Sequence, residues 1–207
     1  MDKFDFRKSY PELYSPGSGD FTLVQVPPMQ YLAMDGHGNP NTSPEYATAL
    51  ECLYPVAYAL KFRSKNELVQ DFTVPPLEGL WRAEEMDAFA RGDKDSWDWT
   101  LLIAQPEWIT AEMVQEAVTE VSAKKDLPAL DRVRLLPLRE GLCAQILFVG
   151  PYDDEAPVLH RLHHTWMPGH ELEFNGEHHE IYLSDPRRTA PEKLRTVLRQ
   201  PVRPVTD

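Results

Sequence analysis

The feature that most constrains this fold is the stretch between residues 74 and 103, where large aromatic side chains gather. Four of the five tryptophans lie in it or just after it, at Trp81, Trp97, Trp99 and Trp108. Side chains of a β-strand point alternately to its two faces. A strand over residues 97–103 therefore has an aromatic and apolar face made of Trp97, Trp99, Leu101 and Ile103, and an opposite face made of Asp98, Thr100 and Leu102.

An acid, Glu78, stands close to these rings in the sequence, flanked by Leu77 and Leu80. Two tryptophans on one strand face near a carboxylate are typical of an aromatic-walled binding site that contains one acid. The same rings can instead fill a hydrophobic core. The residues alone leave both interpretations open.

The charge of the chain bears on its partner. The chain has 207 residues and a formal net charge of −12, from 33 acidic residues against 21 lysines and arginines. Such a balance opposes nucleic-acid binding, which depends on cations that neutralise phosphates. It is compatible with a cationic small molecule. We therefore expect a small-molecule ligand and no nucleic acid.

The termini and cysteines predict a cytoplasmic protein. Residues 1–8 are too mixed for a signal peptide. No run approaches the roughly 20 apolar residues of a membrane span, so we expect no membrane partner. Cys52 and Cys143 lie in apolar segments without motif spacing, which predicts buried free thiols in a reducing compartment.

The order of predicted strands and helices repeats along the chain. Residues 1–20 are expected to form an arm, because proline, glycine and serine recur there. Residues 21–207 are expected to form a single domain of two half-modules, about 21–125 and 126–207. Strands are predicted over residues 21–26, 29–34, 68–74, 97–103, 133–138, 142–149, 178–183 and 196–202, and helices over residues 43–65, 110–125 and 156–167.

Each half offers a hairpin, a turn rich in glycine, proline and aspartate, a long helix and then further strand. This order predicts an α+β fold, in which an antiparallel sheet carries the long helices on one side. Two halves related by a pseudo-twofold axis leave a groove between them, and ligands often bind in such grooves.

Several long segments of the chain follow one pattern, in order. They are Leu53–Phe62, Pro76–Trp81, Trp97–Leu101, Gly141–Cys143, Gly150–Asp153, His178–Arg187 and Ala190–Val202. In these segments the chain resembles the GyrI-like (gyrase-inhibitor-like) small-molecule-binding family, over nearly its whole length from about Gln30.

The resemblance implies a curved antiparallel sheet built from two β-α-β-β modules with two long helices, and a cleft that binds bulky, planar or cationic aromatic molecules. Relatives serve as effector domains of multidrug-sensing transcription activators, as stand-alone binding proteins and, in one subfamily, as hydrolases. Those hydrolases open the cyclopropane of yatakemycin-like DNA-alkylating antibiotics inside an aromatic cage. One position departs from the family pattern: Arg82 stands where a second tryptophan often follows Trp81, which brings a cation near the rim.

The candidate chemistry centres on the segment 178–183, where His178, Glu180 and Tyr182 share one strand face. We expect Glu180 and Glu78, one from each half, to form the acidic side of the groove, because a carboxylate in an aromatic cleft attracts a cation or binds a proton more readily. For ring opening, Glu180 is the candidate that orients a water, and Tyr182 or a histidine is the candidate donor to the carbonyl. The candidate catalytic residues are Glu180 and Tyr182, and the candidate ligand-binding residues are Tyr54, Tyr58, Glu78, Trp81, Trp97, Trp99, Trp166, His178, Glu180 and Tyr182.

Metal chemistry is disfavoured. His160 and His164 have the four-residue spacing of a helical ligand pair, with His163 beside them and His178 or His179 as a third ligand. The helix nevertheless reads His-Arg-Leu-His-His and lacks the His-Glu-x-x-His arrangement of a metalloprotease. We therefore expect surface histidines, no metal and no cofactor.

Three function classes remain. They are a binding or sequestering protein for xenobiotics, a cyclopropyl hydrolase built on the same aromatic cage, and an interaction protein. An interaction with gyrase belongs to the third class, and nothing in the sequence supports it. A transcription regulator is disfavoured, because only about 20 residues precede the first predicted strand and no helix-turn-helix fits there.

Overall fold

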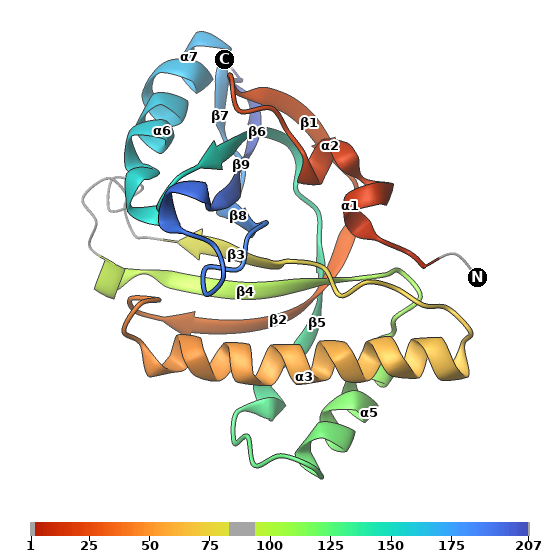
Figure 1. Ribbon diagram of the computed structural model, residues 1–207. Helices are drawn as coiled ribbons and strands as arrows, with labels where there is room; N and C mark the ends of the chain where they lie inside the picture. The colour runs from red at the N-terminus through yellow and green to blue at the C-terminus, as the bar shows by residue number, and fades with distance from the viewer. Residues whose placement is uncertain (1–2, 83–93, 207) are drawn as a thin grey trace.

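The computed structural model describes residues 3–82 and 94–206. These residues form a nine-stranded antiparallel sheet with helices packed against it (Figure 1). The strands are β1 (Thr22–Val26), β2 (Met29–His37), β3 (Leu77–Arg82), β4 (Asp98–Gln105), β5 (Arg134–Leu138), β6 (Gly141–Val149), β7 (Leu172–Phe174), β8 (His178–Tyr182) and β9 (Arg195–Pro204). The helices are α1 (Phe6–Ser9), α2 (Pro11–Tyr14), α3 (Pro44–Glu67), α5 (Ala111–Ser122), α6 (Ala156–Arg161) and α7 (Met167–Gly169). The predicted α+β class is confirmed.

The strand order carries a twofold pattern. It runs β1-β6-β9-β8-β3-β4-β2-β5, with β7 added beside β9. Exchanging β1 with β5, β2 with β6, β3 with β8 and β4 with β9 reverses this order and leaves it otherwise unchanged. The pseudo-twofold axis therefore passes between β3 and β8, the two strands at which the halves of the chain meet.

The two predicted hairpins are wrong. Among the described residues, β1 pairs with β6 and β2 pairs with β5, so β1 and β5 each lie beside a strand from the other half of the chain. The register continues through both crossings, since Val26 faces Gly141 and Met29 faces Leu138. Proline fixes φ at about −65°, whereas the common two-residue hairpin turns need a positive φ. Pro27 and Pro28 therefore carry the chain onward where a hairpin has to fold it back.

The predicted strand over residues 68–74 is also wrong. Within the described residues this segment contributes only an isolated bridge between Phe72 and Phe4. Val69 has φ 57°, a left-handed conformation that interrupts an extended strand. The loop therefore leads the chain from α3 into β3 without joining the sheet.

Helices α3, α5, α6 and α7 cover one face of the sheet. The 24-residue α3 begins at Pro44, after Ser43, and lies along β2 and β4 (Figure 1). Its residues Leu53 and Leu60 pack into a buried core with Leu101 and Ile103 of β4. In the other half the predicted helix over 156–167 forms in three pieces, because a π-helical turn, η4 (Leu162–Trp166), joins α6 to α7. None of the described helices is long and apolar enough to cross a membrane.

The N-terminal helices α1 and α2 cover the opposite face of the sheet. The residues expected to be an arm contain α1 and α2, whose Phe6, Leu13 and Tyr14 are buried against Tyr31 and Ile181. Asp5 caps α1 by accepting the backbone N–H of Arg7. The sheet is therefore buried on both faces, and the two faces differ sharply in their chemistry.

Candidate functional site

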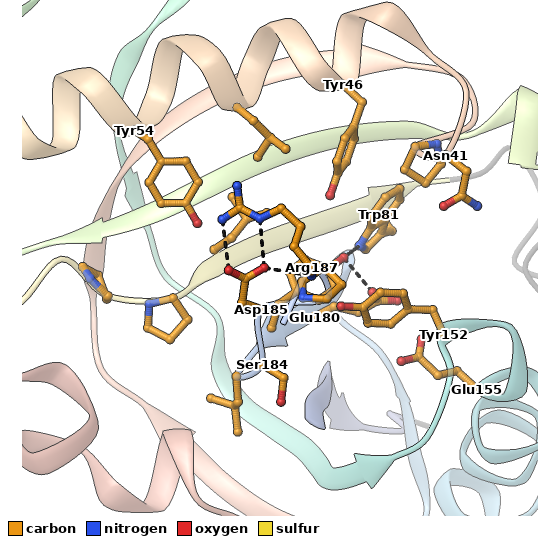
Figure 2. A pocket seen from close by; sticks show the side chains of 18 of the residues that line it. Asn41, Tyr46, Tyr54, Trp81, Tyr152, Glu155, Glu180, Ser184, Asp185 and Arg187 are labelled. Atoms are coloured by element: carbon orange, nitrogen blue, oxygen red, sulfur yellow. Dashed lines mark hydrogen bonds and ion pairs between the residues drawn. The ribbon is translucent and has the colours of Figure 1, made fainter. Parts of the chain in front are cut away.

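A large cavity opens on the face of the sheet that α3 and α6 cover, between the two halves of the chain. Its volume is about 1360 Å³, above the roughly 300–1,000 Å³ of ordinary small-molecule sites. Helix α3 forms one wall, β3 and β8 form the floor, and η3 (Tyr152–Asp154) with the start of α6 forms another wall (Figure 2). The aromatic residues that line it, among those described, are Tyr46, Tyr54, Tyr58, Trp81, Trp97, Tyr152 and Tyr182.

A chain of hydrogen bonds crosses the floor from β3 to β8. The indole Nε1–H of Trp81 donates to Tyr182 Oη at 3.0 Å. The Tyr182 hydroxyl in turn donates to Glu180 Oε2 at 2.7 Å. The Trp81 ring lies over Gly79, where an added Cβ stands 3.0 Å from the indole nitrogen. Glycine at position 79 therefore allows the indole to reach Tyr182.

The second oxygen of Glu180 faces a buried histidine. His178 Nε2 lies 3.4 Å from Glu180 Oε1, and the Glu180 side chain is 12% exposed. Burial, with a further contribution from Glu180, raises the pKa of Tyr182 well above its usual range. The phenol therefore keeps its proton and holds the Glu180 carboxyl group in place on the cavity floor.

A second carboxyl group, Glu155, lies in the wall beside this floor. Its side chain lines the cavity although the residue is only 5% exposed. Its Oε1 is buried and has no hydrogen-bond partner within the described residues. Burial first, and then the charge of Glu180, raise the pKa of Glu155 well above its usual range. The cavity thus holds two carboxyl groups in different surroundings: Glu180 accepts a hydrogen bond from Tyr182, and Glu155 is buried beside the hydroxyl of Thr196, which partly offsets the rise in its pKa.

Aromatic rings meet in pairs along the walls. Trp81 and Trp97 pack edge to face with ring centroids 5.5 Å apart. Tyr152 and Tyr182 pack in the same way at 5.6 Å. Such pairs contribute about 0.5–1.5 kcal/mol beyond the area they bury, and their faces attract cations. The cavity is therefore lined by paired aromatic rings.

Charged side chains gather at the mouth. Arg187 forms a two-bond ion pair with Asp185, with both nitrogen–oxygen distances at 3.0 Å (Figure 2). Lys94 pairs with Asp153 and lies 5.9 Å from the centre of the Trp97 ring. Acids outnumber lysines and arginines by six to three in the described lining, which contains Asp5, Glu51, Asp153, Glu155, Glu180 and Asp185 against Arg7, Lys94 and Arg187.

The structure brings together six of the ten candidate ligand-binding residues and separates four. The six that line the cavity are Tyr54, Tyr58, Trp81, Trp97, Glu180 and Tyr182. The four that do not line it are Glu78, Trp99, Trp166 and His178. His178 still shares the strand face of Glu180, behind the cavity surface.

Glu78 does not join Glu180, which corrects the expected acidic pair. Strand alternation turns Gly79 and Trp81 toward the cavity and turns Glu78 toward the opposite face. There Glu78 is fully buried, accepts the Tyr14 hydroxyl at 2.9 Å and lies 2.9 Å from His179 Nε2. Arg82 has the same parity as Glu78 and contacts Thr100 and Glu177, so it is not a cation at the rim.

Two candidate tryptophans pack in or against the hydrophobic core and do not line the cavity. Trp99 is fully buried and lies against Gly36, where an added Cβ stands 2.0 Å from the ring. It supports the cavity indirectly, because it packs edge to face on Tyr46 at 5.2 Å. Trp166 is partly buried and packs on Phe21 against the core of the second half, outside the cavity lining. Some of the tryptophans therefore line a cavity, as Trp81 and Trp97 do, while Trp99 fills the hydrophobic core.

Tyr46, Tyr152 and Glu155 line the cavity but were not among the candidate ligand-binding residues. Tyr46 shares the apolar face of α3 with Leu50 and Tyr54. The helical periodicity of the sequence could therefore have predicted that Tyr46 lies on the same wall as Tyr54. Tyr152 and Glu155 lie in a turn rich in proline and aspartate, where acids are ordinarily exposed. Only the packing of that turn against β8 reveals that Glu155 is buried.

The histidines do not assemble a metal site within the described residues, where no group of three or more His, Cys, Asp or Glu side chains is arranged to hold an ion. His160 and His164 are exposed and pack ring to ring at 4.5 Å. His163 is partly buried, and burial lowers its pKa to about 3. Cys52 and Cys143 are buried free thiols, as predicted.

Comparisons with known proteins agree with this fold. Residues 19–203 match a family described as a GyrI-like small molecule binding domain. A hydrolase from Listeria innocua is 38% identical, with a TM-score of 0.86 over 98% of this chain and 100% of its own. A second hydrolase from Listeria innocua is 35% identical, with a TM-score of 0.85 over 97% of this chain and 100% of its own. An uncharacterized conserved protein from the same organism is 38% identical, with a TM-score of 0.88 over 97% of this chain and 100% of its own. A search of curated proteins found no match.

Proposed function

The chain belongs to the GyrI-like small-molecule-binding family, and we propose that its cavity binds bulky aromatic molecules that are planar or positively charged. In this function the protein sequesters xenobiotic compounds of this kind. Free buried thiols support a cytoplasmic site of action.

One observation carries the proposal: the Glu180 carboxyl group is fixed on a floor of aromatic rings. The Tyr182 hydroxyl holds one of its oxygens at 2.7 Å, and Trp81 holds Tyr182 in turn. A ligand cation above this floor gains attraction from the carboxylate and about 0.5–2 kcal/mol from a ring face. The acidic excess in the lining favours the same class of ligand.

The test uses two dyes with one ring scaffold and opposite charges. We expect a cationic rhodamine to bind wild type at least tenfold more tightly than anionic fluorescein does, measured by fluorescence titration. Glu180→Gln keeps the shape of the side chain and removes its charge. It should weaken rhodamine binding roughly tenfold, which corresponds to about 1.4 kcal/mol.

Glu192→Gln supplies the matched control, because Glu192 is exposed in η5 (Pro191–Lys193) and lies outside the lining. It should leave both dyes unaffected. Equal binding of the two dyes, or rhodamine binding that Glu180→Gln leaves unchanged, contradicts the electrostatic part of the proposal. Failure of wild type to bind any planar aromatic compound contradicts the proposal as a whole.

A second candidate function is hydrolysis in the same cavity. Two proteins named hydrolases resemble this chain at 35% and 38% identity across 97% and 98% of its length. We propose as the alternative that the protein adds water to the cyclopropane of yatakemycin-like DNA-alkylating antibiotics. In that reaction the water oxygen forms a bond to a ring carbon as the strained carbon–carbon bond breaks. The electron pair moves through the conjugated system to the carbonyl oxygen, which takes a proton.

The floor supplies candidates for this chemistry. Glu180 can orient the attacking water and accept its proton, while the surrounding rings exclude competing solvent. Mass spectrometry after incubation with a cyclopropanoid distinguishes the two functions. A product heavier by one water, absent with Glu180→Gln, supports hydrolysis. Recovery of intact compound under conditions where it binds leaves sequestration as the function.

A further inference from the structure

Lys94 is a cation of the cavity lining that lies against one of the aromatic rings. It begins η1 (Lys94–Ser96), and the backbone N–H of Trp97 donates to its carbonyl oxygen at 3.4 Å. A 3₁₀ helix has three residues per turn, so side chains three positions apart lie on the same side. The Lys94 ammonium accordingly lies 5.9 Å from the centre of the Trp97 ring. Among the described residues, this is the one cation–ring contact in which both partners line the cavity.

A carboxylate completes the surroundings of this ammonium. Asp153 belongs to η3, far from η1 in the sequence, and it lines the same cavity and forms an ion pair with Lys94. The Lys94 side chain is 21% exposed, whereas that of Asp153 is 79% exposed. A ring face and a carboxylate each attract a cation, and proteins bind quaternary ammonium ligands with such groups. Lys94 therefore occupies a place that also suits the ammonium group of a ligand.

The lysine can leave this place without disturbing the groups around it. An ion pair with one partner mostly in water contributes little, because water screens the charges and holding a long side chain costs entropy. The lysine stem is flexible, so its ammonium can swing into solvent. The Trp97 ring stays, because it packs edge to face on Trp81 at 5.5 Å. Departure of the ammonium thus leaves a ring face and an accessible carboxylate side by side.

We propose that the Trp97 ring face and Asp153 form a second cation subsite of the cavity, and that Lys94 is a specificity-determining residue that occupies it. A ligand with a compact ammonium group takes this subsite only by displacing the lysine. Glu180 on the floor then remains the acid that is open to a ligand cation. The inference rests on the proposed function and narrows its ligand class to cations whose charge reaches Glu180, rather than those with a pendant ammonium group.

The test compares para-hydroxyphenyltrimethylammonium with para-tert-butylphenol, which have the same shape and differ by one positive charge. Isothermal titration calorimetry measures both compounds against wild type, Lys94→Met, Asp153→Asn and the double variant. We expect Lys94→Met to bind the ammonium compound roughly fivefold more tightly than wild type does, and to bind the phenol equally well. Asp153→Asn alone should change little, because Lys94 already neutralises the acid. In the double variant the gain should disappear.

Lys193→Met is the matched control, because Lys193 is exposed in η5, lies outside the lining and carries the same charge. An equal gain with Lys193→Met, a gain that survives Asp153→Asn, or an equal gain for the phenol overturns the subsite. Unchanged or weaker binding of the ammonium compound by folded Lys94→Met overturns it as well. Urea unfolding checks the fold of each variant, and Lys94→Gln replaces Lys94→Met if the latter is unfolded.

Rhodamine binding by wild type reports separately on the proposed function. A wild type that binds rhodamine, with no gain in Lys94→Met, overturns the role of Lys94 and leaves the proposed function standing. A wild type that binds no planar aromatic compound overturns the proposed function, whichever way Lys94→Met behaves.

Discussion

The two faces of the central strands β3 and β8 each present a glutamate that accepts a tyrosine hydroxyl. On the cavity face Tyr182 donates to Glu180 at 2.7 Å, and on the opposite face Tyr14 donates to Glu78 at 2.9 Å. The surroundings then diverge. Glu78 pairs with His179 at 2.9 Å, and both residues are fully buried.

The opposite face continues as a closed network. His179 Nδ1 lies 2.9 Å from Glu140, and Glu140 lies 3.5 Å from the buried guanidinium of Arg199. Arg199 also donates to the backbone carbonyl of Leu13 at 2.8 Å, which ties α2 to the sheet. Two acids face two cations when His179 is protonated, so this face has no charge left for a ligand. The cavity face keeps two carboxyl groups, Glu155 and Glu180, and therefore has bonding capacity left over.

The largest expected effect tests whether the network is structural. Arg199→Met leaves the Glu140 carboxylate buried beside fewer cations and removes the bond to Leu13. Breaking one partner of a buried ion pair costs about 3–5 kcal/mol. We expect a loss of this size in the free energy of unfolding, measured with urea. Arg203→Met is the matched control on the same strand, because its pair with Glu173 is exposed and such pairs contribute only about 0–1 kcal/mol. Equal losses in the two variants contradict the contrast between the faces.

The next effect is a fall in stability as the pH rises. The carboxyl groups of Glu140 and Glu78 raise the pKa of His179 from 6.5 to about 9, against the opposing effect of burial. The folded protein then binds this proton more tightly than the unfolded chain does. The contribution is complete below pH 6.5 and is lost between pH 6.5 and 9, and it amounts to roughly 3 kcal/mol.

Urea unfolding at a series of pH values checks this expectation. The raised pKa of Glu155 also makes stability fall with rising pH, so wild type is compared with His179→Gln and Glu155→Gln. The slope between pH 6.5 and 9 should flatten in His179→Gln. A slope that His179→Gln leaves unchanged shows that the histidine is not the titrating group.

The smallest effects come from a matched pair of substitutions. Tyr14→Phe leaves Glu78 without its phenol in a sealed network, and we expect a loss of about 2 kcal/mol in unfolding free energy. Tyr182→Phe removes the equivalent hydroxyl beside Glu180, but water in the cavity can replace it. We expect a loss below about 1 kcal/mol there, together with weaker rhodamine binding. A larger loss from Tyr182→Phe than from Tyr14→Phe reverses the assignment of the structural and functional faces.

The alternation of side chains along a strand predicts part of the site. The pattern correctly placed Glu180 with Tyr182 on one face of β8. The same rule separates Glu78 from Trp81, because the two residues are three positions apart on β3. Strand alternation therefore already places Glu78 and Trp81 on opposite faces of β3, and so argues against Glu78 joining Glu180 in the cavity. Glu78 belongs to the sealed face with Leu80, and its burial there needs His179 and Tyr14 as partners.

Strand alternation does not predict which tryptophans line the cavity and which lie in the core. Trp97 and Trp99 share a face of the segment 97–103, as predicted, yet Trp97 lines the cavity and Trp99 lies in the core. The difference depends on Gly36 of β2, which leaves room for the Trp99 ring, and on Tyr46 of α3, which covers it. Neither contact can be read from the strand that carries the tryptophans.

The sequence by itself determined the α+β class, the extent of α3 and α5, and which side chains share a strand face. These features depend on backbone geometry that repeats every two or 3.6 residues, and on helix start signals such as Ser43-Pro44. Only the tertiary structure decided that β1 and β5 cross between the halves, that Glu78 is buried on the opposite face from Glu180, and that Glu155 is buried. Strand pairing and desolvation arise from contacts between segments far apart in the chain, and local periodicity does not specify them.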